Sequence, residues 1–83
     1  MTSTPRKATR RRQAEPSAAA VFGKKLREAR LKAGMTQAQV AHGAGLSLNR
    51  MSLIEQGRSD LRLSSARALA RAVGAALSDL VSE

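Results

Sequence analysis

Apolar residues recur at intervals of three and four positions along most of this chain, and this spacing constrains the fold more than any other feature. Residues spaced in this way share one face of an α-helix. The first series consists of Val21, Phe22, Leu26, Ala29 and Ala33. A later series consists of Leu63, Ala66, Leu69, Ala70 and Val73. No stretch alternates apolar and polar residues with a period of two, so the sequence predicts an all-α protein without a sheet.

Glycines and small polar residues divide the periodic region into five expected helices. The glycines placed to end helices are Gly34, the pair in the 43–45 stretch, Gly57 and Gly74. Thr36 followed by Gln39 fits a capping box that opens the second helix, and Ser47 is suited to cap the third. The chain has 83 residues, which is room for one compact domain. We therefore expect a compact five-helix bundle.

Residues 1–20 differ in composition from the rest of the chain. Residues 1–16 contain five Lys or Arg, one Glu, and several Thr, Ser and Pro residues, without periodic apolar positions. Because such a segment has little apolar surface to bury, we expect residues 1–20 to form a disordered basic arm and residues 21–83 to form the domain. The arm either contacts nucleic acid or is a solvated tail; the sequence leaves both open.

The charge of the chain indicates a polyanionic partner. Fifteen Lys and Arg against six Asp and Glu give a net charge of +9, which favours nucleic acid or an anionic membrane surface. No apolar run approaches the roughly 18 residues of a membrane span, and no secretory signal is present, so we expect a cytoplasmic protein. With no Cys and one His, the chain lacks the residues for a metal site or a catalytic centre. We expect neither a cofactor nor enzymatic activity.

The second and third expected helices are separated by about four residues, 44–47, which include Gly45. A short glycine-containing turn between two helices is typical of the helix-turn-helix motif. In that motif the first helix crosses the DNA backbone and the second lies in the major groove. The spacing therefore favours duplex DNA as the partner.

Several strings extend this pattern along the domain. They are Leu26-Arg27-x-x-Arg30, Gly34-Met35-Thr36-Gln37, Val40-Ala41, Ala44-Gly45-Leu46-Ser47, Met51-Ser52-x-Ile54-Glu55-x-Gly57 and Leu69-Ala70-x-Ala72-Val73-Gly74. Over residues 21–82 the chain resembles the Cro/phage-repressor-type (XRE) helix-turn-helix family. Within that family it is similar to restriction–modification controller proteins and small regulators of mobile elements. The resemblance implies a phage-repressor-type fold and a transcriptional regulator.

The third expected helix would supply the base contacts. Leu48, Asn49, Arg50, Ser52 and Leu53 are expected to face outward. Asn49 is suited to adenine, and Arg50 to guanine or a phosphate. Leu48 and Leu53 can contact thymine methyl groups, although Leu53 could instead cover a subunit contact or rest on the next loop. Ser52 could contact either a base or a phosphate.

Other residues are expected to contact the DNA backbone. They are Thr36, Gln37, Ser47, Arg58, Ser59 and Arg62. The resemblance implies a phosphate contact for Gln37, which could otherwise serve only as a capping residue. Family members often have Pro then Ser or Thr before the fourth helix, where this chain has Leu61 and Arg62. Asp60 or Ser64 is then the expected cap.

Two further expectations concern stability and assembly. The resemblance pairs Arg30 with Glu55 in a structural ion pair between the first and third helices. Leu77, Leu80 and Val81 at the C-terminal end are expected to form a homodimer contact. A dimer of this kind would bind a pseudo-palindromic operator with half-sites about 10–10.5 bp apart, as an autoregulatory activator or repressor. The alternative is an antitoxin-like or adaptor module whose main partner is a protein, such as a toxin or an antagonist.

Overall fold

The computed structural model describes residues 17–82, which form an all-helical fold. Its helices are α2 (Ala18–Lys32), α3 (Gln37–Ala44), α4 (Leu48–Glu55), α5 (Leu63–Val73) and α6 (Leu77–Val81). The expected all-α, five-helix architecture is confirmed for this part of the chain. The domain begins earlier than residue 21, because the Ser17 hydroxyl accepts a hydrogen bond from the Ala20 N–H at 3.1 Å and caps α2. The expected basic arm otherwise lies outside the described residues.

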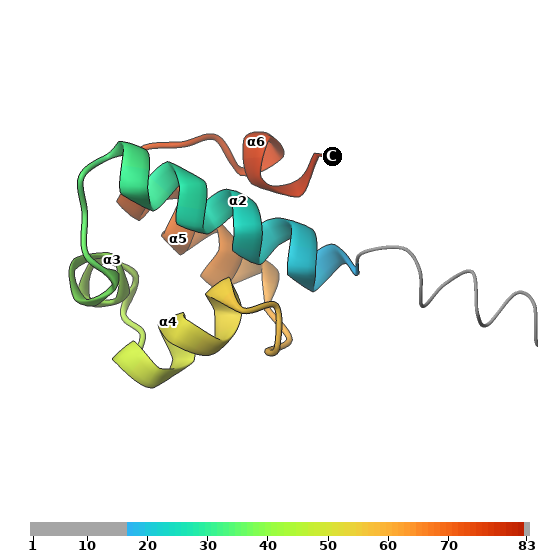
Figure 1. Ribbon diagram of the computed structural model, residues 1–83, viewed down its shortest axis with the longest axis horizontal. Coiled ribbons are helices and arrows are strands. Elements are labelled where there is room, and N and C mark those ends of the chain that lie inside the picture. Colours follow the sequence, from blue (N-terminus) through green and yellow to red (C-terminus); the bar gives the residue numbers. More distant parts are fainter. Residues whose placement is uncertain (1–16, 83) are drawn as a thin grey trace, which may run out of the picture.

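Helix α2 is the central element of the bundle. It packs against α4, α5 and α6, while α3 packs against α4 and α5 (Figure 1). Each helix turns its apolar face to a common centre. The buried apolar side chains there are Phe22, Leu26, Val40, Ala41, Met51, Ile54, Ala66, Leu69, Ala70, Val73 and Leu80. All five helices contribute to this core, so the position of α3 and α4 depends on the whole domain.

The helix ends follow the sequence signals in α3 and α4 but not in α5. The Thr36 Oγ1 accepts from the Gln39 N–H at 3.1 Å, and the Gln39 Oε1 accepts from the Thr36 N–H at 2.8 Å. This is the expected capping box. The N-cap residue of α5 is Arg62, and it makes no side-chain cap. The expectation that Asp60 or Ser64 caps α5 is wrong, because Asp60 lies two residues too early and Ser64 lies inside the first turn.

Gly23 allows α2 and α4 to approach each other backbone to backbone. A Cβ atom at this position would lie 2.3 Å from the Ile54 carbonyl oxygen and 2.9 Å from that of Glu55. Such distances are far below a van der Waals contact, so only glycine fits without a shift of one helix. The close approach brings the C-terminal end of α4 onto α2, where Arg30 lies on a later turn.

Candidate nucleic-acid interface

Helices α3 and α4 form a helix-turn-helix unit with a turn of three residues, Gly45–Ser47. Gly45 adopts a φ of +71°, a left-handed conformation that favours glycine. The turn is also closed by a hydrogen bond from the Leu46 N–H to the Ala41 carbonyl at 2.8 Å. Figure 1 shows α3 almost end-on and α4 running across the view, so the two helices meet at a steep angle. This is the arrangement expected from the spacing, with Ala44 belonging to α3.

The expected ion pair between Arg30 and Glu55 is present. Arg30 Nε donates to Glu55 Oε2 at 2.6 Å and Arg30 Nη2 to Glu55 Oε1 at 3.1 Å, while Nη1 donates to the Met35 carbonyl at 3.0 Å. The side chains are only 10% and 3% exposed. The hydrogen bond to Glu55 and its negative charge raise the pKa of Arg30, with burial opposing them. Arg30 therefore stays charged and ties α2 to the end of α4.

Gln37 joins this ion pair as a third member. Its Nε2 donates to Glu55 Oε1 at 3.0 Å, which links the first turn of α3 to the last turn of α4. The family resemblance implied a phosphate contact for Gln37, and no residue pattern indicated this bond to Glu55. One amide hydrogen is used by Glu55, so the second amide hydrogen and the side-chain oxygen are the groups left for a ligand.

The outward face of α4 carries most of the residues expected there. Leu48 is 53% exposed, Asn49 is exposed, and Ser52 and Leu53 are half-buried. Met51 and Ile54 point into the core. The Ser52 hydroxyl accepts a hydrogen bond from Gln56 Nε2 at 3.0 Å. Gln56 was not among the expected site residues, although it lies one turn after Ser52 on the same face of the helix.

Arg50 does not point outward as the sequence predicted. Its Nη2 donates to the Asp60 carbonyl oxygen at 3.1 Å, and its Nε atom is buried without a partner. The side chain thus lies against the loop between α4 and α5. The physical reason is the path of the loop before α5, which places the Asp60 carbonyl oxygen outside any helix and beside α4, where it accepts from the guanidinium as well as from the Ser59 hydroxyl.

The residues expected to contact phosphates precede α4 in the chain or lie on the loop that follows it. Thr36 and Ser47 are N-caps whose hydroxyl oxygens accept backbone N–H groups, which leaves each O–H free to donate. Arg58 and Arg62 are exposed on the loop before α5. Ser59 on the same loop is half-buried and donates to the Asp60 carbonyl at 3.2 Å. Gln37 donates to Glu55 in the last turn of α4, and Arg50 in the first turn of α4 donates to Asp60 on the loop before α5.

The expected dimer contact needs correction at Leu80. This side chain is 2% exposed and belongs to the core, because α6 turns it toward α2; it cannot contact a partner. Val81 is 56% exposed and Leu77 half-buried. Leu63 is 68% exposed, although its place in the periodic series predicted an inward side chain. These three residues help to line an apolar groove of about 380 Å³ beside Phe22.

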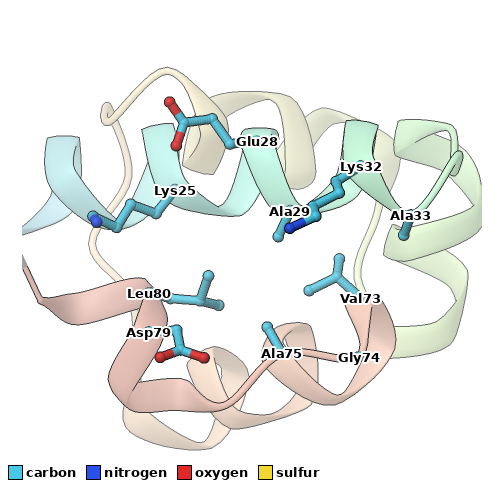
Figure 2. Close-up of a pocket in the computed structure, with 10 residues that line it drawn as sticks. All are labelled: Lys25, Glu28, Ala29, Lys32, Ala33, Val73, Gly74, Ala75, Asp79 and Leu80. Atoms are coloured by element: carbon cyan, nitrogen blue, oxygen red, sulfur yellow. The ribbon is translucent and has the colours of Figure 1, made fainter.

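A second hollow, of about 450 Å³, lies between α2 and the turn from α5 to α6. In Figure 2 Lys25 and Lys32 extend from α2 and Asp79 from α6, while Glu28 points away from the hollow.

Among residues 17–82, no three His, Cys, Asp or Glu side chains are grouped as metal ligands. In the same residues no helix has the length and apolar character needed to cross a bilayer.

Comparisons with known proteins agree with this geometry. Residues 21–82 match the family described as "Helix-turn-helix domain". The clp gene regulator ClgR from C. glutamicum is similar in structure, with a TM-score of 0.76, 27% identity, and coverage of 80% of this chain and 86% of that one. The restriction-modification controller protein C.AhdI from Aeromonas hydrophila is also similar, with a TM-score of 0.71, 29% identity, and coverage of 75% and 94%. No curated protein sequence matches significantly. The chain belongs to the helix-turn-helix domain family of DNA-binding transcriptional regulators, which are not enzymes, and its fold is like that of the controller proteins.

Proposed function

We propose that this protein is a sequence-specific regulator that binds duplex DNA as a homodimer, with α4 of each protomer in the major groove. The observation that carries the proposal is the network of Arg30, Glu55 and Gln37. It fixes both α3 and the end of α4 to α2, while Leu48 and Asn49 at the start of α4 stay exposed. A helix braced in this way can enter a groove without being deformed.

The proposed base contacts come from the outward face of α4, and the backbone contacts come from its two flanks. Leu48, Asn49, Ser52 and Leu53 would meet base edges. The remaining proposed contacts, which would meet phosphates, come from Thr36, Gln37, Ser47, Arg58, Ser59 and Arg62. Phosphate contacts fix the register of the protein on the duplex, and base contacts supply the specificity.

A homodimer is proposed because one short helix reads too few base pairs to select an operator. The exposed apolar side chains of Leu63 and Val81, with the half-buried Leu77 between them, support a subunit contact at the α5–α6 end. A two-fold dimer would place two α4 helices in successive major grooves. The operator would then be pseudo-palindromic, with half-sites about 10–10.5 bp apart.

We also propose that the protein acts in the cytoplasm on the promoter of its own gene. The likeness to a restriction-modification controller protein supports this role, and the net charge of +9 supports binding to DNA. Occupancy of one or more operators would then decide between activation and repression.

Footprinting of the purified full-length protein on the DNA upstream of its own gene tests the proposal. We expect protection of a pseudo-palindrome, and we expect Asn49→Ala to lose it while the circular dichroism spectrum stays helical. Leu31→Ala is the matched control, because Leu31 is exposed on α2 outside the proposed interface. Protection that survives Asn49→Ala would contradict the role of α4. A protein that binds no duplex even at low salt would instead favour a protein partner.

A further inference from the structure

The outward side chains of α4 restrict which base pairs the helix can read, given the proposed function. Asn49 supplies an amide and Leu48 an apolar side chain, both exposed, while the Ser52 hydroxyl and the Leu53 side chain are half-buried. Arg50 is the only Lys or Arg in α4. The commonest specific contact to guanine is a bidentate bond from Arg or Lys to its O6 and N7 atoms. Guanine recognition by α4 therefore depends on whether Arg50 is available.

Arg50 is engaged elsewhere. Its guanidinium donates to the Asp60 carbonyl, and the buried Nε atom shows that the side chain is packed against the protein. The loop that it contacts carries Arg58 and leads into Arg62, the N-cap residue of α5 that makes no side-chain cap. A move of Arg50 into the groove would break this bond and leave the Asp60 carbonyl with the Ser59 hydroxyl as its other donor. Arg50 is therefore placed to hold the loop.

The remaining groups match the major-groove edge of an A·T pair. The Asn49 amide can accept from adenine N6 and donate to N7. Leu48 is 53% exposed, and Leu53 lies one turn after Asn49 on the same face. An apolar side chain gains by burying the C5-methyl group of thymine. A G·C pair at the same place would set the polar N4 amino group of cytosine against a leucine without a hydrogen-bond partner.

We propose that α4 reads A·T base pairs, with Asn49 on adenine and Leu48 and Leu53 on thymine methyl groups, while Arg50 holds the loop between α4 and α5 instead of reading guanine. The inference rests on the proposed function and names the base pairs that the same surface recognises.

The test is selection of duplexes from a randomised DNA library by the full-length protein, followed by replacement of thymine with deoxyuridine in the selected duplex. Deoxyuridine lacks only the methyl group. We expect half-sites rich in A·T pairs at the positions read by α4. Removal of one contacted methyl group should weaken binding about fourfold, and removal of two symmetry-related groups about fifteenfold.

Three variants separate the contributions. Leu48→Ala should lose the discrimination between thymine and deoxyuridine at its own contact. Leu31→Ala, an equally exposed leucine on α2, should keep it. Arg50→Met should weaken binding to the selected duplex and to a scrambled duplex by the same factor, with the selected motif unchanged.

A conserved guanine in the half-site whose selection disappears in Arg50→Met would overturn the inference. Equal binding of thymine and deoxyuridine duplexes by the wild-type protein would also overturn it, and this comparison does not depend on the folding of any variant. Either result leaves the proposed function intact. Selection that enriches no motif at all would instead contradict the proposed function.

Discussion

The ion pair of Arg30 with Glu55 offers a quantitative test of how α4 is held. Arg30→Met removes the cation but leaves the Glu55 carboxylate, which is 3% exposed, with Gln37 as its remaining side-chain partner in the network. Removing one member of a buried pair costs about 3–5 kcal/mol, because the other charge is then buried without compensation. A domain of this size has a free energy of unfolding of only about 3–10 kcal/mol. We therefore expect the Arg30→Met variant to be largely unfolded or only marginally stable.

Urea denaturation followed by circular dichroism measures this loss. Arg27→Met is the matched control, because Arg27 is exposed on the same helix and its replacement should change the free energy of unfolding by less than about 0.5 kcal/mol. Replacing both charges, as in Arg30→Met with Glu55→Leu, should recover at least about 2 kcal/mol relative to Arg30→Met, since no isolated charge remains. A single variant within about 1 kcal/mol of wild type, or a double variant that loses the sum of both single changes, would refute this reasoning.

Three further changes probe the packing, the caps and the assembly. Gly23→Ala should lower the free energy of unfolding by at least about 2 kcal/mol, because the new methyl group meets the Ile54 carbonyl oxygen; an unchanged urea midpoint would contradict the close approach. Thr36→Ala removes the capping hydroxyl of α3 and should cost about 1 kcal/mol in the same titration, whereas a neutral effect would show that the cap is dispensable. Leu63→Asp should convert the proposed dimer to a monomer in light scattering without loss of helix, because an acidic residue suits the first turn of α5 but not an apolar contact; a variant that remains dimeric would exclude this groove.

The helices were largely predictable because their signals are local. The capping box of Thr36 and Gln39, the cap at Ser47 and the glycine after α3 each act within a few residues of the chain. Periodicity then identified most of the core. Arg30 and Glu55 lie 25 residues apart, so their pairing was predictable only from the family resemblance.

The corrections concern features that depend on how the elements meet. Arg50 points to Asp60 because of the path of the loop before α5, which no local pattern specifies. Leu63 was expected to face inward and is exposed, whereas Leu80 was expected at the dimer contact and is buried. In a helix as short as α6 and at the first residue of α5, spacing alone does not determine which side faces the core.

The central claim is that the α3–α4 unit binds duplex DNA with sequence specificity, and fluorescence anisotropy across a salt series tests it most directly. The probes are the footprinted operator and a scrambled duplex of the same length. Arg58 and Arg62 of two protomers supply four cations, so log K should fall against log salt with a slope of about −3.6 or steeper. The operator should bind at least about 10³ times more tightly than the scrambled duplex. Equal affinity for both duplexes, or affinity that does not change with salt, would contradict the account.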